Sequence, residues 1–198
     1  MRINLGSGSD KREGYVNIDA FAEQADIRSD LCTLGIQAGS ASEVYCSHVL
    51  EHLSEHQVLN ALGEMRRVLS PDGGRAEILV PDFQWCVENW LNLPESQRWG
   101  WAIDTIFGNQ NHEGEYHRTG FTVGRMRALL QKSGFTDIDV GTVFSHGMQS
   151  VKAIAMARAV STGSPIEIPK RATNKIVMAK FRLRAFWDAL RILWKGNG

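Results

Sequence analysis

Three short polar segments follow what we predict to be strands near the start of the sequence, and together they could bind a nucleoside. Gly6-Ser7-Gly8 closes the first strand, where glycine lets the backbone take a positive φ and approach a ligand closely. Asp19 ends the second strand, where a carboxylate can accept hydrogen bonds from a ribose diol. Asp30 and Leu31 follow the third, where an Asp side chain and the next backbone N–H could read an adenine edge. A turn, a diol acceptor and a base reader in this order predict one binding site.

A second group of candidates is His48-Val49-Leu50-Glu51-His52, which matches the HxxEH pattern of some zinc proteases. That interpretation puts both histidines on zinc with Glu51 as general base, and it needs a third ligand, for which Glu113 and Glu115 are candidates. The local sequence disfavours it. The segment directly follows a strand, and Ser54 with Gln57 forms a capping box that starts a helix only afterwards. We therefore expect no metal ion here and expect His52 to bond a nearby backbone carbonyl.

The elements that must position these residues alternate between strand and helix. We predict strands at 2–5, 14–19, 25–28, 42–47 and 76–80, a helix from Ser54 ended by the turn at 71–74, a helix at 122–133, and strands at 136–143 and 150–158. Residues 83–121 show no regular pattern, and they hold four of the six tryptophans. Such alternation with short connections is typical of an α/β fold with a mainly parallel sheet, whose ligands bind at the carboxyl ends of the strands.

The spacing argues against a dinucleotide enzyme. No GxGxxG follows the first strand, and 11 residues separate Gly8 from Asp19, where dinucleotide folds have about 20. Asp19 and Asp30 are equally close. We therefore expect the first two crossover helices to be shortened to loops, which would leave a bound ligand more exposed.

At this point the sequence resembles class I S-adenosylmethionine (SAM)-dependent methyltransferases. The likeness is carried, in order, by INLGSG, GYVNIDA, ADIRSDL, SEVYCSHVLEHL and RRVLSPDGGRAEILVPDF. A later stretch, FGNQNHEGEYHRTGFTVGRMRALLQKSGF, is similar to small methyltransferases associated with cell-surface polysaccharide and lipopolysaccharide synthesis, so the resemblance covers residues 2–158. The chain departs from the pattern at Asn4, where the family usually has an acidic residue, and at Asp10, the family's third glycine position.

The resemblance implies a Rossmann-like sheet of seven mostly parallel strands with an antiparallel last strand, and SAM as cofactor. It implies that Gly6-Ser7-Gly8 surrounds the methionine part of SAM, that Asp19 binds the ribose, and that Asp30 with Leu31 binds the adenine. His48, just past the fourth strand, would then lie near the methyl group. Some O-methyltransferases of similar fold bind a divalent metal near this position, so a weak metal site stays an alternative.

Methyl transfer to a hydroxyl needs an in-line approach and a group that removes the proton. We favour His117 or His48 as base, with Asp82 as orienter, over His112 and Glu115. The leading function is O-methylation of a glycan or glycolipid precursor, and the alternatives are methylation of a small soluble metabolite and a non-catalytic SAM-binding role. The tryptophans of the irregular stretch are divided between core and acceptor contact in this interpretation, namely Trp85, Trp90, Trp99 and Trp101.

Charge divides the chain into a body and a tail. Residues 1–160 hold 14 Lys and Arg against 20 Asp and Glu, a net charge of −6, whereas residues 161–198 hold 8 against 2, a net charge of +6. We predict a methyltransferase domain over 1–160, a linker over 161–172 and a basic amphipathic helix over 173–198. Its apolar face could contact an anionic membrane surface, the domain itself or a second subunit. The acidic body argues against nucleic acid as a partner.

Three cysteines, an odd number without metal-type spacing, favour a reducing compartment. The first strand begins at residue 2 and leaves no room for a signal peptide, and no apolar stretch is long enough to span a bilayer. We expect a cytoplasmic protein, with peripheral contact at the inner membrane face through its tail.

Overall fold

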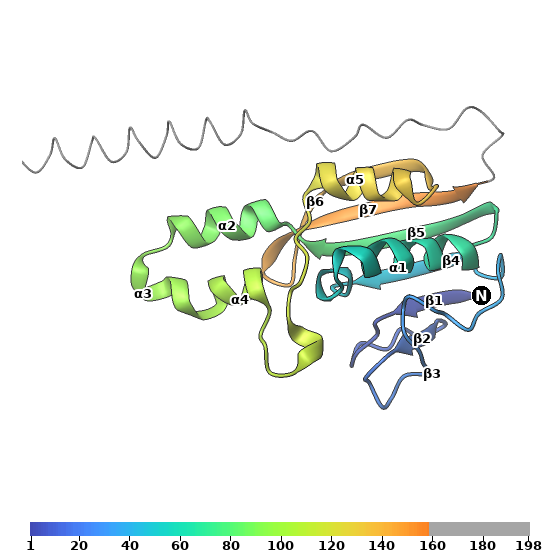
Figure 1. Ribbon diagram of the computed structural model, residues 1–198, viewed down its shortest axis with the longest axis horizontal. Helices are drawn as coiled ribbons and strands as arrows, with labels where there is room; N and C mark the ends of the chain where they lie inside the picture. Colours follow the sequence, from blue (N-terminus) through green and yellow to red (C-terminus); the bar gives the residue numbers. More distant parts are fainter. Residues whose placement is uncertain (159–198) are drawn as a thin grey trace, which may run out of the picture. The chain divides into compact units, whose positions relative to one another are not determined.

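The computed structural model describes residues 1–158, which form one seven-stranded sheet with helices packed on it (Figure 1). The strand order is β3-β2-β1-β4-β5-β7-β6. The first five strands pair with one another in parallel, whereas β7 runs antiparallel to both β5 and β6. The strands are β1 (Arg2–Leu5), β2 (Val16–Asp19), β3 (Ile27–Arg28), β4 (Glu43–Ser47), β5 (Asp72–Pro81), β6 (Thr136–Ser145) and β7 (Met148–Arg158). The expected architecture, antiparallel last strand included, is confirmed.

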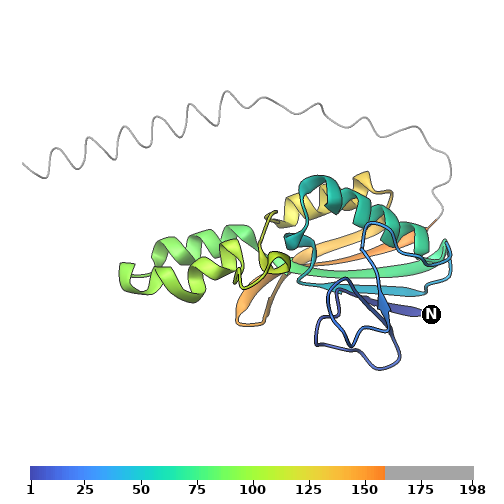
Figure 2. The same cartoon turned by 60° about the horizontal axis from the view of Figure 1, so that its bottom comes forward.

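Two helices cover one face of this sheet, α1 (Glu55–Val68) and α5 (Val123–Lys132) (Figure 2). The capping box expected at the start of α1 is present, with the Ser54 side chain accepting from the Gln57 N–H. The apolar positions of α1 recur at helical spacing and pack with the buried faces of β1, β4 and β5 in a single core. The positions concerned on α1 are Val58, Ala61, Leu62, Met65 and Val68.

The opposite face of the sheet carries charged side chains. Along β5 the buried Ala76 and Ile78 alternate with partly exposed Arg75 and Glu77. Arg75 pairs with Glu43 and Glu77, and Glu77 also accepts from Lys152 at 2.8 Å. These ion pairs form a row across three strands, β4, β5 and β7. In the described part of the chain β1, β2 and β3 are joined by loops without helices, as the short spacings predicted. Helices usually cover both faces of a parallel sheet, whereas within residues 1–158 this face carries charged pairs.

The stretch from 83 to 121, expected to be irregular, contains helices, so that prediction was wrong. A segment that we call the helical arm, residues 83–107, holds α2 (Phe83–Asn92), the short α3 (Glu95–Gln97) and α4 (Ile103–Phe107), and it extends beyond the carboxyl ends of the strands (Figure 1). A kinked turn, η2 (Arg98–Ala102), joins α3 to α4. The expected linker at 161–172 and the C-terminal helix lie outside the described residues.

Candidate active site

A cavity of about 730 Å³ lies at the carboxyl ends of β1, β2 and β4, where the sequence predicted ligand binding. We call it the first cavity. Its volume falls within the range of small-molecule and cofactor sites. The residues predicted to contact one ligand meet at its wall, together with the loop before β4 and the short turn η3 (Glu113–Glu115). The predicted residues on its wall are Gly6, Gly8, Asp19, Asp30, Leu31 and His48.

Gly6 allows the backbone to turn directly beneath the first cavity. Its φ is +63°, and a Cβ built there would lie 2.2 Å from Cγ2 of Val49. No other residue type fits this position without moving Val49. Ser7 differs from the expectation, because it is only 4% exposed and the wall is formed by Gly6, Gly8 and Ser9 around it. The left-handed turn at Gly6 buries the Ser7 side chain, and its Oγ has no partner among the described residues.

Asp19 organises the loops on both sides of the first cavity. Its Oδ2 accepts from the Gly8 N–H at 2.8 Å, and its Oδ1 accepts from the N–H groups of Phe21 and Ala22 at 2.7 and 2.8 Å. Partial burial raises the pKa of this carboxyl, but the three N–H donors and Arg28 outweigh burial and leave it below the ordinary value. The carboxylate therefore stays ionised beside the cavity and keeps lone pairs for a ligand diol.

Asp30 and Leu31 form the part of the wall beyond β3. Asp30 Oδ1 accepts from the Cys32 N–H at 2.8 Å, which fixes the turn that presents both residues. Leu31 is 6% exposed and offers an apolar surface at the same wall. An acceptor beside an apolar contact suits the edge and face of a flat heterocycle.

Asn4 and Asn17 hold the loop that stands in place of the first crossover helix. Both are 3% exposed, and Asn4 Nδ2 donates to Asn17 Oδ1 at 2.9 Å and to the Asp10 carbonyl at 3.0 Å. Asn17 Oδ1 also accepts from the Arg12 N–H, while its Nδ2 donates to Asp26. Asn4, the departure from the family pattern, is thus a structural residue that ties the loop to the sheet.

The HxxEH segment does not form an α-helix. His48 follows β4 with φ +54°, and its N–H donates to the Leu79 carbonyl. A short 3₁₀ turn, η1 (Leu50–His52), comes next, and α1 begins only after Ser54. The expected carbonyl partner of His52 is present, because its Nδ1 lies 3.3 Å from the Tyr116 oxygen. His48 and His52 line the first cavity and also a smaller one next to it.

This second cavity, of about 150 Å³, is lined mainly by polar side chains from segments far apart in the sequence. The Glu51 carbonyl accepts from the N–H groups of Arg118 and Thr119 at 2.7 and 3.1 Å, which brings His117 beside Glu51 and His52. Burial lowers the pKa of His117, and Glu51 opposes that shift. The residues lining it are His48, Glu51, His52, Pro81, Trp101, Asp104, Thr105, Asn109, Glu115, His117 and Met148.

Glu51 stands out within this wall because it is 2% exposed and neither carboxylate oxygen has a hydrogen-bond partner among the described residues. Nδ1 of His48 lies 3.2 Å from Glu51 Oε1, outside hydrogen-bond geometry, and Nε2 of His48 is buried with no hydrogen-bond partner within residues 1–158. Ligand atoms of Glu51, His52 and His117 all lie within 4.8 Å of one another. The sequence indicated each of these residues separately, but not that His117 would join the other two.

Asp82 has a structural environment. Its Oδ1 accepts from the Gln84 N–H as the N-cap of α2, and its Oδ2 accepts from Gln149 at 2.9 Å. Asp82 lines neither cavity, whereas the preceding residue, Pro81, lines the second cavity. The carboxylate fixes α2 against β7, and within residues 1–158 it accepts no hydrogen bond from a histidine.

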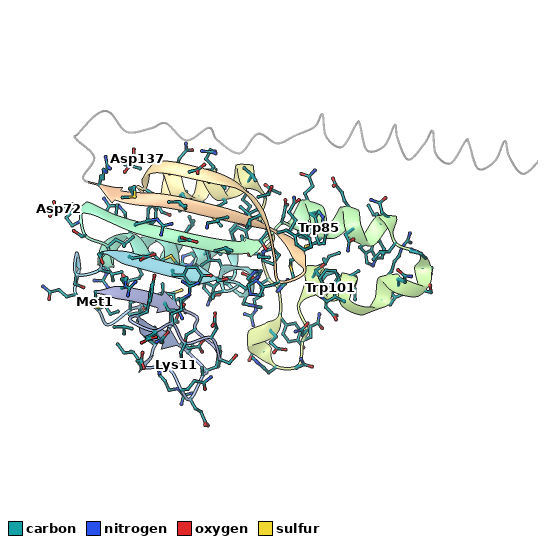
Figure 3. All side chains as sticks on the ribbon, turned by 180° about the vertical axis from the view of Figure 1, so that it is seen from behind. Met1, Lys11, Asp72, Trp85, Trp101 and Asp137 are labelled. Atoms are coloured by element: carbon teal, nitrogen blue, oxygen red, sulfur yellow. The ribbon has the colours of Figure 1, made fainter. Side chains whose placement is uncertain are left out.

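The tryptophans of the helical arm are more exposed than expected, and none is fully buried. Trp85 and Trp101 lie at the base of the arm with ring centroids 6.4 Å apart (Figure 3). Trp99 is 66% exposed and Trp101 is 49% exposed, and only Trp101 lines the second cavity. The assignment of two tryptophans to the core was therefore wrong, because the arm extends from the sheet and its aromatic rings pack mainly on one another.

Comparisons with known proteins agree with this geometry. Residues 10–75 match the family described as Methyltransferase domain. A SAM-dependent methyltransferase from Thermotoga maritima has a TM-score of 0.55 and 13% identity, with 79% of this chain and 81% of that one covered. One from Archaeoglobus fulgidus has a TM-score of 0.54 and 15% identity, with 78% and 84% covered. No curated protein matches the chain in sequence.

A third solved structure contains bound ligands. The 1,6-didemethyltoxoflavin-N1-methyltransferase of Burkholderia thailandensis, solved with its substrate and S-adenosylhomocysteine, has a TM-score of 0.53 and 15% identity, with 79% of this chain and 70% of that one covered. At these identities the likeness establishes the fold. The domain match and that fold support an enzyme of the SAM-dependent methyltransferase class, with SAM as its cofactor.

Proposed function

We propose that this methyltransferase methylates a hydroxyl oxygen of a polar acceptor, preferably a sugar of a glycan or glycolipid precursor. The observation that carries the proposal is the second cavity, which shares His48 and His52 with the first cavity. An acceptor group in it would therefore lie beside the cofactor. Its wall combines carboxylates, imidazoles, an amide and the aromatic side chain of Trp101, and this combination suits a sugar with its hydroxyls and apolar ring face.

The chain's own residues supply binding and proton removal. Asp19 and Asp30 would hold the adenosine, and the backbone around Gly6 and Gly8 would hold the methionine part. When bound, SAM supplies a methyl group on a positively charged sulfur. An acceptor in the second cavity faces the imidazoles of His48 and His117 and the Glu51 carboxylate, which are the groups available to assist loss of its proton.

The test is transfer from SAM carrying a labelled methyl group to extracts of cells that lack the protein. We expect label in the lipid or polysaccharide fraction, and we expect it to survive mild alkali, since a methyl ether does and a methyl ester does not. The Asp19→Ala variant is the control for transfer through this cofactor site. Label in small water-soluble compounds would overturn the glycan proposal in favour of the metabolite alternative. SAM binding by calorimetry without any transfer would favour a non-catalytic role.

His117→Ala tests whether the second cavity takes part in the reaction. His117 lines the second cavity and not the first, so turnover should fall at least about tenfold while SAM affinity stays within about twofold. Unchanged turnover in this variant would show that the acceptor binds elsewhere.

A further inference from the structure

We propose that Glu51, His52 and His117 form a binding site for a divalent transition-metal cation at the wall of the second cavity. The three side chains come from η1 and from the segment that follows η3, and their ligand atoms lie within 4.8 Å of one another. Two imidazoles and one carboxylate make a donor set suited to Zn²⁺, Mn²⁺ and Fe²⁺.

Glu51 is the strongest argument for a cation. A carboxylate that is 2% exposed, with both oxygens unpartnered among the described residues, is costly to bury unless a positive charge compensates it. No lysine or arginine side chain of residues 1–158 forms an ion pair with it, and the basic groups beside it are the imidazoles of His48, His52 and His117. A bound cation would be coordinated by the Glu51 oxygens and would compensate the negative charge of the buried carboxylate.

His52 has the second hydrogen bond that metal-binding histidines usually make. Its Nδ1 lies 3.3 Å from the Tyr116 carbonyl oxygen. That contact places the proton on Nδ1 and leaves Nε2 with a free lone pair. Backbone carbonyls in this position orient the ring and fix its tautomer for coordination.

The backbone holds the three residues together without any ion. The backbone carbonyl of Glu51 accepts from the N–H groups of Arg118 and Thr119, and the His117 N–H donates to the Phe107 carbonyl at 2.9 Å. Two donors bound at 2.0–2.1 Å to one tetrahedral ion lie about 3.4 Å apart, so binding would draw the side chains inward by about 1 Å. Three protein ligands leave one or more positions open towards the second cavity, as in catalytic metal sites.

The cation's role in the reaction rests on the proposed function, whereas its binding does not. Coordinated to an acceptor hydroxyl, it would favour loss of the proton to His48 or to water. The acceptor oxygen then forms a bond to the methyl carbon, the carbon–sulfur bond breaks, and its electron pair stays on sulfur. In this scheme His117 is a ligand and not the base, which reassigns one of our two candidates for that role.

The first experiment measures metal binding by the full chain without a polyhistidine tag. The protein is stripped with a chelator, incubated separately with Zn²⁺, Mn²⁺ or, in the absence of oxygen, Fe²⁺, then desalted and analysed by mass spectrometry for metal content. We expect about one equivalent of Zn²⁺ or Mn²⁺ and a higher melting temperature with that ion. Less than about 0.1 equivalent of every ion, with no change in melting temperature, would overturn the proposal.

Matched variants locate the site. Glu51→Gln and His117→Asn should each weaken binding at least about tenfold, whereas Glu55→Gln and His56→Asn, exposed residues a few positions on, should bind like the wild type. Circular dichroism and SAM calorimetry report folding of each variant, because neither Glu51 nor His117 lines the first cavity. Equal metal binding by all four variants would show that the ion binds elsewhere and would contradict the assignment of Glu51 and His117 as metal ligands.

The two proposals can fail separately. Stoichiometric metal binding lost in Glu51→Gln supports the site even if no acceptor is ever methylated. Conversely, hydroxyl methylation by a protein that binds none of the three ions would retain the proposed function and remove the metal.

Discussion

At the scale of single residues, Gly6 is where one added methyl group has the largest effect on the first cavity. Gly6→Ala would place a Cβ 2.2 Å from Val49 at φ +63°, so we expect about 1–3 kcal/mol of destabilisation and at least tenfold weaker SAM binding. Denaturant titration and calorimetry measure the two effects. Gly124→Ala on α5 is the control, since a Cβ there meets nothing within 4 Å, and a similar loss in that variant would contradict the argument.

The fold keeps the Asp19 carboxylate ionised, and SAM binding should depend on that negative charge. Asp19→Asn leaves an amide facing three N–H donors that the carboxylate now satisfies, so we expect at least tenfold weaker binding, with Asp10→Asn, an exposed neighbour, unaffected. The pKa of Asp19 is lowered in the folded protein. The contribution of the ionised carboxylate to SAM binding is therefore fully present above the ordinary pKa of 3.8, and it is lost only as pH falls through the lowered pKa. Wild-type affinity that already declined near pH 6 would contradict this assignment.

Single residues also show where sequence reasoning stopped. Gly6, Asp19 and Asp30 were predictable because each follows a strand, and parallel strand ends share one edge of the sheet. The burial of Ser7 was not, because it depends on the direction in which the Gly6 turn sends the chain. The meeting of Glu51 with His117 was not either, since backbone hydrogen bonds join segments more than sixty positions apart.

At the scale of elements, the loop between β1 and β2 connects the two strands in place of the crossover helix that parallel strands usually have. The hydrogen bonds of Asn17 attach this loop to the sheet. Asn17→Ala removes bonds to Asn4, to the Arg12 N–H and to Asp26 and leaves buried groups unsatisfied, so we expect a loss of about 2–4 kcal/mol. The urea midpoint measures it, and SAM affinity should fall in parallel because Gly8 and Ser9 belong to that loop. Asn60→Ala on the exposed surface of α1 is the control, and an equal loss there would refute the anchoring role.

Burial against the sheet decides which helices the sequence predicts well. The capping box at Ser54 and the apolar stripe of α1 predicted that helix because it buries five residues against the sheet. The interpretation failed at α2, whose apolar residues do recur at helical spacing but bury only Cys86 and leave the aromatic rings partly exposed. The other helices of the arm, α3 and α4, have only three and five residues, too few for a periodic pattern to mark them, and the helical arm was interpreted as irregular.

At the scale of the whole molecule, charge is the property that separates the two ends of the sequence. The body from 1 to 160 carries a net charge of −6 and the remainder +6. No helix of the described residues is long and apolar enough to cross a membrane. An acidic catalytic body is repelled by anionic lipid, so any attraction to such a surface must come from the basic end. A glycolipid acceptor would make that attraction useful, because it would bring the two cavities to the surface where the acceptor resides.

The full chain should therefore co-sediment with vesicles containing anionic lipid and not with neutral ones. Basic residues near such a surface contribute about 1 kcal/mol each, so replacing Lys180, Arg184, Arg191 and Lys195 by glutamate should abolish binding at physiological salt. SAM affinity of this variant should remain unchanged, since every described residue that lines the first cavity is retained. Binding that persists in the variant, or that is equal on neutral vesicles, would mean that the basic end serves the domain or a second subunit. The apolar face predicted for the helix over 173–198 would then be buried in protein, and the acceptor would reach the second cavity from solution.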